Sequence, residues 1–235
     1  KKIWEITSIE NKSDELICEL NYLSKNLEEG YPGNLDCKAI YTLNNNNEFI
    51  IKYSAVSDAD TLINITNHNY WNFHGHGKYY QNISNHNVVV YSESVCENNI
   101  NSIPTGKLFK VKNTNFDLLE EKNITQEFLD SGGIDNNYEL ENDFKLKKIA
   151  KVYSNLTRMG VTYFSDQPGI QFYTGNMMDN KYNGKYNRKY GCQYGLCLEP
   201  QFYPNAINQE NFYKPILRAN EKYNSTILMK LKNNF

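Results

Sequence analysis

The chain has 235 residues, 40% of them hydrophobic, so it is long enough to bury a large core, and residues 1–235 are most simply one domain. With 25 basic and 27 acidic residues and a formal net charge of -2, it has no basic stripe for nucleic acid and no polybasic segment for a membrane. No apolar run approaches the length of a transmembrane helix, and the first residues lack the apolar core of a signal peptide. We therefore exclude nucleic acid and membrane as partners and expect a cytoplasmic protein.

The hydrophobic pattern predicts short strands along most of the chain. Runs of β-branched and aromatic residues occur, in chain order, at 38–43, 48–53, 62–66, 87–91, 160–164, 170–174 and 225–231. Turn-forming residues lie between them, such as the four asparagines at 44–47 and the Pro-Gly pair at 168–169. Only 125–129 reads as one or two helical turns. The pattern predicts an all-β protein with a large, mostly antiparallel β-sandwich.

The cysteines give no sign of a disulfide framework or a zinc site, because their number is odd and no CxxC spacing occurs. We expect small buried thiols in a reducing compartment. The five are Cys18, Cys37, Cys96, Cys192 and Cys197.

Histidine is the side chain most easily kept in both protonation states near neutral pH, and three of the four histidines lie within nine positions, beginning at His68. Around it, residues 64–73 follow a strand pattern and alternate polar groups with large aromatic residues. Aromatic rings cover the C–H patches of a pyranose, while amides and imidazoles bond its hydroxyls, so this segment suits a sugar site. From these residues alone, a satisfied polar side chain at a strand end fits His68 at least as well.

Two histidines separated by a glycine, His74 and His76, could share one face of a strand and bind a metal ion. No further cysteine, histidine or aspartate stands nearby at ligand spacing, and glycines on both sides of His76 favour an exposed loop. We therefore predict no metal site.

Two later segments each contain one polar group of interest. Gln171 lies among aromatic residues and could bond either a substrate hydroxyl or only the backbone of a neighbouring strand. Glu199 follows an apolar run and precedes a proline. Its carboxylate either faces solvent at a strand end or is held in a pocket with a shifted pKa.

Taken together, the three segments resemble the aldose 1-epimerase (galactose mutarotase) family. The family patterns are T-N-H-S-Y-F-N, P-G-[IV]-Q-F-Y-T-G-N and C-L-E-x-Q-x-x-P-[DN]-A-[IV]-N-Q. Residues 66–72 follow the first pattern except at Asn69 and Trp71, and residues 168–176 and 197–209 follow the other two. Shorter matches at 28–35, 103–106, 133–138 and 215–218 extend the similarity over nearly the whole chain.

The resemblance implies the mutarotase-like β-supersandwich and interconversion of the α and β anomers of a free hexose, galactose or glucose, with no metal or cofactor. By position, Glu199 corresponds to the general base and His68 to the general acid. The resemblance further assigns sugar binding to Asp135, Gln171 and Asn67. A carboxylate that takes the proton of the C1 hydroxyl, and an imidazolium that protonates the ring oxygen, would open the ring.

Family members carry a further amino-terminal portion ahead of the equivalent of residues 2–4, with an Asn-Arg pair and a His-Gly-Gly motif. This chain has no His-Gly-Gly, and its three arginines do not stand in the family's Asn-Arg setting. We therefore expect a sandwich that is incomplete on its amino-terminal side. Missing strands would leave unpaired edges and an exposed apolar face, so we also expect a separate chain that supplies the segment.

Two other functions stay open at this point. A catalytically inactive carbohydrate-binding or regulatory module could keep the same fold, although the presence of both His68 and Glu199 argues against it. A hexose-6-phosphate epimerase would need clustered arginines to hold the phosphate, and three dispersed arginines do not supply them. The carboxylate clusters of a calcium-dependent lectin are also lacking.

Overall fold

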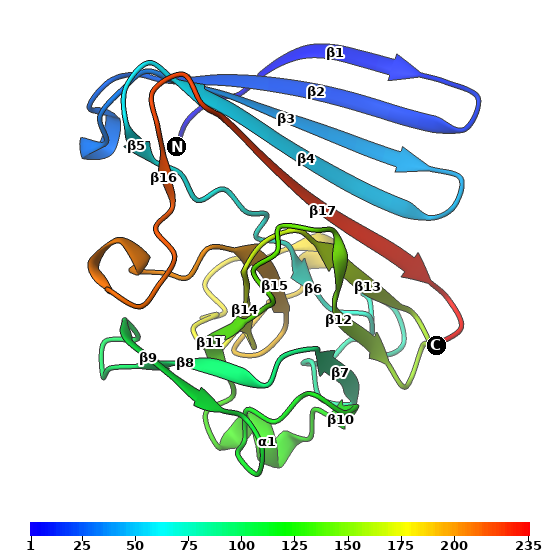
Figure 1. Ribbon diagram of the computed structural model, residues 1–235. Helices are drawn as coiled ribbons and strands as arrows, with labels where there is room; N and C mark the ends of the chain where they lie inside the picture. Colours follow the sequence, from blue (N-terminus) through cyan, green and yellow to red (C-terminus); the bar gives the residue numbers. More distant parts are fainter.

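The computed structural model describes all residues from Lys1 to Phe235, and two antiparallel sheets contain most of its strands (Figure 1). The larger sheet has nine strands, in the spatial order β1 (Glu5–Asn11), β2 (Glu15–Ser24), β3 (Leu35–Asn44), β4 (Glu48–Ser57), β17 (Lys222–Lys232), β13 (Gly160–Ser165), β12 (Lys147–Ser154), β7 (His86–Val90) and β10 (Lys122–Asn123). The smaller sheet has six, in the order β6 (Tyr70–Trp71), β15 (Leu196–Gln201), β14 (Gly169–Tyr173), β11 (Asp135–Glu139), β8 (Ser94–Asn98) and β9 (Pro104–Lys110). The all-β, mostly antiparallel fold predicted from the sequence is confirmed.

A few short elements complete the chain. They are the two-stranded sheet of β5 (Thr61–Leu62) and β16 (Ile216–Leu217), the 3-10 turns η1 (Glu28–Gly30), η2 (Lys185–Asn187) and η3 (Ala206–Asn208), and the helix α1 (Gln126–Asp130). The helix begins where a helical turn was predicted, because the hydroxyl of Thr125 accepts a hydrogen bond from the Phe128 backbone N–H at 3.1 Å. No helix has the length and hydropathy that spanning a membrane requires.

One main core joins the two sheets. On the six-stranded sheet it includes Phe172 of β14 and Leu198 of β15, and on the nine-stranded sheet it includes Tyr163 of β13, all essentially without exposure. Successive side chains of a strand point to opposite faces, so burying Phe172 and Leu198 turns their neighbours Gln171 and Glu199 to the other face. The alternation of the strands thus sets the polar groups of β14 and β15 on one surface.

Six of the seven predicted runs coincide with strands, namely β3, β4, β7, β13, β14 and β17. The run at 62–66 is the exception, because β5 ends at Leu62. Beyond it, the side-chain amide of Asn64 accepts from the backbone N–H of Phe202 at 2.9 Å and donates to its carbonyl at 3.1 Å. The hydrogen bonds of the Asn64 side chain replace those of a backbone ladder, so the segment is fixed in place without forming a strand. The strand pattern around His68 likewise yields only the two residues of β6.

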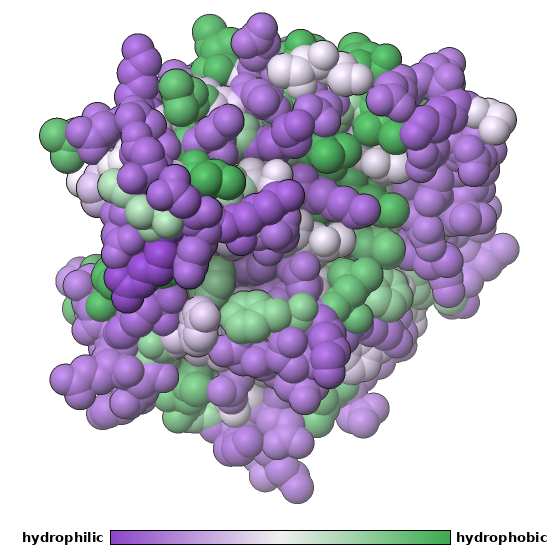
Figure 2. All heavy atoms as spheres, turned by 45° about the horizontal axis from the view of Figure 1, so that its top comes forward, coloured by the Kyte–Doolittle hydropathy of each residue, from purple (hydrophilic) through white to green (hydrophobic).

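Strands β1 to β4 fan out at the top of the molecule, with β1 at the edge of the nine-stranded sheet (Figure 1). This part of the sheet exposes several large apolar side chains: Ile6, Ile9, Leu16, Leu23, Leu43 and Val56. Figure 2 shows hydrophobic side chains scattered among hydrophilic ones on this side of the molecule. Strand β1 thus leaves one edge of the nine-stranded sheet unpaired, beside several exposed apolar side chains.

Candidate active site

The register of three neighbouring strands brings the predicted polar residues together. In the pairing of β14 with β15, Gln171 stands opposite Glu199. In the pairing of β11 with β14, Asp135 stands opposite Tyr173, two residues from Gln171 on the same face. One surface of the six-stranded sheet therefore carries two carboxylates and an amide side by side.

A cavity of about 540 Å³ opens over this surface, within the usual range for a small-molecule site. It is lined by His68, Tyr70, Asp135, Gln171, Tyr173, Met177, Met178, Asp179 and Glu199. Four of the five residues predicted from the sequence are among them. The fifth, Asn67, lies instead in an adjoining cavity of about 450 Å³ that His68 also borders. The assignment of Asn67 to sugar binding stays a prediction.

Glu199 has the electrostatics of a general base. The residue is only 7% exposed, and no backbone or side-chain group donates a hydrogen bond to its carboxylate. Burial, and then the negative charge of Asp135, raises the pKa of Glu199 to about 7. Its charged and neutral forms are therefore both populated near neutral pH, as a group that takes up and releases a proton requires.

His68 is the only histidine in the cavity, and its imidazole reaches the carboxylate. Its Nε2 atom lies 3.5 Å from Oε1 of Glu199, and about half of its side chain is exposed. The ring stacks on Tyr70, with centroids 5.0 Å apart and an angle of 18° between the planes. Tyr70 in turn meets Tyr173 edge to face at 6.4 Å. The two tyrosines support the imidazole and offer aromatic surface to a ligand.

Asp135 and Gln171 form a hydrogen-bonded pair in the floor of the cavity. The Nε2 group of Gln171 donates to Oδ1 of Asp135 at 2.7 Å. The Oε1 atom of the same amide is buried and has no partner. A buried acceptor without a partner is costly in free energy, and a ligand hydroxyl that reached this oxygen would remove that cost.

Sequence reasoning did not identify five of the lining residues. Tyr173 could have been found, because it lies two positions after Gln171 on one strand and must share its face. Tyr70 is half exposed, whereas its neighbour Trp71 packs against the core and donates to the Tyr163 hydroxyl at 2.6 Å. Met177, Met178 and Asp179 follow β14 in an irregular segment where no periodicity gives a signal.

The His74 and His76 side chains do not form a shared metal site. His74 is buried and bonds the Ser154 hydroxyl at 2.8 Å and the Ser84 carbonyl at 2.7 Å, while His76 bonds the Tyr190 hydroxyl. The ligand-type atoms that do gather belong to His68, Cys197 and Glu199, and all three lie within 4.8 Å of one another.

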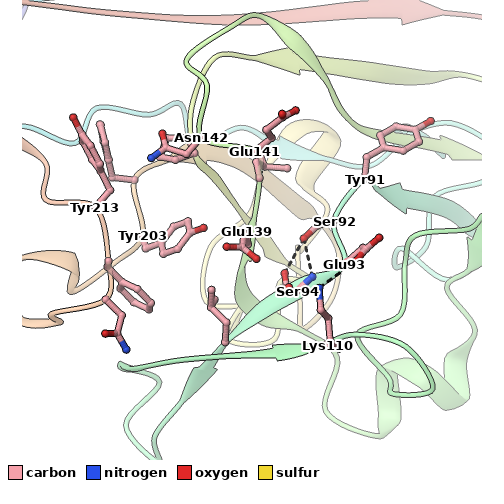
Figure 3. Close-up of a pocket in the computed structure, with 16 residues that line it drawn as sticks. Tyr91, Ser92, Glu93, Ser94, Lys110, Glu139, Glu141, Asn142, Tyr203 and Tyr213 are labelled. Atoms are coloured by element: carbon pink, nitrogen blue, oxygen red, sulfur yellow. Dashed lines mark hydrogen bonds and ion pairs between the residues drawn. The ribbon is translucent and has the colours of Figure 1, made fainter.

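A larger cavity, about 680 Å³, lies elsewhere and has different chemistry (Figure 3). Glu139 stands in it between Tyr203 and Ser94, as Figure 3 shows. Its other carboxylates include Glu93, which is paired with Lys110 at 3.1 Å, and no histidine lines it. Because it offers no imidazole beside a carboxylate, we assign the candidate active site to the cavity of Glu199 and His68.

Comparisons with known proteins show the family to which the chain belongs. Residues 1–230 match the family described as aldose 1-epimerase. The chain is 36% identical to galactose mutarotase of Sus scrofa over 88% of its own length and 60% of that protein. It is 34% identical to galactose mutarotase of Homo sapiens, over 90% of its own length and 62% of that protein. It is 29% identical to aldose 1-epimerase of Escherichia coli, over 96% of its own length and 65% of that protein.

Solved structures share the fold. An aldose epimerase homologue from C. elegans superposes with a TM-score of 0.86 at 22% identity, over 99% of this chain and 69% of that one. Galactose 1-epimerase from Lactobacillus acidophilus superposes with a TM-score of 0.82 at 22% identity, over 100% of this chain and 68% of that one. These likenesses confirm the mutarotase-like sandwich expected from the sequence.

The chain spans about three fifths of the length of the mammalian relatives that it matches. The comparisons lend no support to the separate chain that we expected to supply an amino-terminal segment. Nor do they support the expectation that an amino-terminal segment is missing.

Proposed function

This chain belongs to the aldose 1-epimerase family, and from that premise we propose that it interconverts the α and β anomers of a free hexose, galactose or glucose. One observation carries the proposal. A buried carboxylate whose pKa lies about 7 stands 3.5 Å from an imidazole, in a cavity lined by tyrosines and hydrogen-bonding groups.

In the proposed reaction, Glu199 takes the proton of the C1 hydroxyl while protonated His68 gives a proton to the ring oxygen. The bond between C1 and the ring oxygen breaks, and the open aldehyde forms. Both oxygens are bonded to C1, so two groups that stand close together can each reach one of them. After rotation about the C1–C2 bond, the two residues exchange roles and the ring closes as the other anomer.

The remaining lining groups would hold the sugar. The free Oε1 of Gln171 and the carboxylate of Asp135 suit hydroxyl groups, and the rings of Tyr70 and Tyr173 suit the C–H face of a pyranose. Tyr70 also keeps the imidazole of His68 in place by stacking on it. We further propose a cytoplasmic location, supported by five cysteines that form no disulfide, although Cys192 is exposed and Cys18 is half-buried.

Polarimetry of freshly dissolved α-galactose and α-glucose tests the activity. We expect the wild type to accelerate the change in rotation and Glu199→Gln to lose about 10²–10⁴-fold of that acceleration. Glu139→Gln is the control, since it makes the same change at a half-buried carboxylate on the same sheet but in the other cavity. A Glu199→Gln protein as fast as the control would remove the assigned base. A wild type that binds the sugar without accelerating its conversion would favour the inactive binding module.

A further inference from the structure

We propose that His68, Cys197 and Glu199 form a binding site for a soft divalent cation such as Zn²⁺, and that the bound ion inhibits the protein. The Nε2, Sγ and carboxylate oxygen atoms of the three residues lie within 4.8 Å of one another. Binding of the ion follows from this geometry alone, whereas its inhibitory effect rests on the proposed function.

The fold places the thiol beside the acid and the base. Cys197 and Glu199 are two apart on β15, so both point to the face that carries the cavity. In the register of the sheet, Cys197 stands opposite Tyr70 on one side and Tyr173 on the other, and the Tyr70 ring stacks on His68. The thiol thus lies beneath the pair of groups assigned to proton transfer.

The distances suit a tetrahedral ion. Zinc binds nitrogen and oxygen at about 2.0–2.2 Å and sulfur at about 2.3 Å, which puts two ligand atoms roughly 3.4 Å apart. Nε2 of His68 and Oε1 of Glu199 are already separated by 3.5 Å. Closing the sulfur onto the same ion requires a movement on the order of 1 Å, and three protein ligands leave a fourth position for water.

The chemistry favours a soft or borderline ion over calcium or magnesium. Thiolate and imidazole select zinc and its neighbours, whereas calcium and magnesium require mainly oxygen ligands. A thiol binds such an ion as the thiolate, so coordination by Cys197 releases the thiol proton to solvent.

Occupation of this site removes both catalytic groups at once. The ion takes the Glu199 oxygen that would accept the C1 hydroxyl proton and the His68 nitrogen that would protonate the ring oxygen. Sugar and ion therefore cannot use the site together, and we expect inhibition that a chelator reverses.

Cobalt(II) is a suitable probe, because a tetrahedral cobalt site with a thiolate ligand absorbs strongly in the near ultraviolet and the visible. We expect these bands in the wild type, their displacement by Zn²⁺, and their retention in Cys192→Ser, which changes an exposed cysteine. Cys197→Ser should lose the thiolate band and bind Zn²⁺ at least about tenfold more weakly. His68→Gln should also weaken binding. Because the His68 side chain is half exposed, we expect this variant to fold even if Cys197→Ser does not.

The outcomes separate this inference from the proposed function. Bands that depend on Cys197 in a protein without mutarotation would uphold the metal site and remove its inhibitory role. A protein that accelerates mutarotation but shows no thiolate band would overturn the site. Bands that persist in Cys197→Ser and vanish in Cys192→Ser would overturn it as well.

Discussion

Glu199 stands beside a second carboxylate, and this neighbour should control the pH at which the protein works. In the proposed reaction Glu199 acts in its charged form, so kcat/KM should rise with pH as Glu199 loses its proton near its raised pKa of about 7. Asp135→Asn removes one cause of that raised pKa, and we expect the rising part of the profile to move to lower pH. Polarimetry over a series of buffers, corrected for the uncatalysed reaction, measures the pH profile of kcat/KM for the wild type and the variant.

Asp179→Asn is the control for this prediction. Asp179 lines the same cavity, but it pairs with Lys181 at 2.6 Å and does not contribute to the shift at Glu199. If both variants moved the profile equally, or neither moved it, the assigned electrostatic role of Asp135 would be wrong.

At the scale of single residues, the sequence indicated those site residues that belong to strong motifs. His68, Asp135, Gln171 and Glu199 all line one cavity. Asn67 borders the adjoining cavity instead, which His68 lines as well. The raised pKa of Glu199 could not be predicted from the sequence either, since it depends on burial and on Asp135, a carboxylate 64 positions away in the chain.

At the scale of elements, Gly169 illustrates how closely the loop after β15 covers the sheet. A Cβ atom at Gly169 would come within 2.6 Å of Nδ2 of Asn137 and 2.8 Å of the Tyr203 ring. We expect Gly169→Ala to lower the free energy of unfolding by about 1–3 kcal/mol, because both neighbours must move. Urea denaturation measures the change.

Gly77→Ala serves as the comparison, because nothing lies within 4 Å of the added methyl group there. Equal unfolding midpoints for the two alanine variants would mean that the contact between Tyr203 and the sheet is looser than the structure indicates.

Strands with long β-branched or aromatic runs were predictable, and half-exposed strands were not. The residues of β1 are almost all exposed, and those of β2 mostly half-buried, so neither strand carries a marked apolar run. Strand preference depends on the neighbours across the sheet, which a single sequence does not provide. The segment at 62–66 shows the opposite error, a predicted strand that does not form. There the hydrogen bonds of the Asn64 side chain replace the ladder that its β-branched residues favour.

At the scale of the whole molecule, Glu199 should make stability depend on pH. Its pKa rises from 4.5 to about 7 on folding, so the folded state holds this proton more tightly than the unfolded state. The contribution of the group is therefore most favourable below pH 4.5 and is lost as the pH rises towards 7. Glu199→Gln removes the penalty, so the variant should be more stable than the wild type at pH 8 by roughly 1–3 kcal/mol and equally stable at pH 4.

Urea denaturation at the two pH values tests this prediction. A difference of the same size at pH 4 and pH 8 would show that packing, and not charge, separates the two proteins. The buried pair His74 and His86 acts in the opposite direction, since burial lowers both pKa values, that of His86 to about 3, and stability is lost as the pH falls below 6.5. Both proteins share that loss, so it cancels in the comparison.

For the whole molecule, the fold class was predictable from the sequence, but the order of the strands in the two sheets was not. The strand pattern predicted an antiparallel sandwich, and the motifs indicated which one. The arrangement depends on pairings between distant segments, such as β17 between β4 and β13, which join the two ends of the chain to its middle. No local pattern in the sequence specifies those pairings.

The central claim is that Glu199 and His68 act as one acid and base pair on a free hexose. Magnetisation exchange between the α and β anomeric protons of galactose at equilibrium measures that conversion directly, in the wild type, Glu199→Gln, His68→Gln and the double variant. We predict that each single change slows the exchange by about 10²-fold or more, and that the double variant is about as slow as the slower single variant, because groups that act as a unit are not additive. Single variants that exchange as fast as the wild type, or losses that multiply in the double variant, would contradict the account.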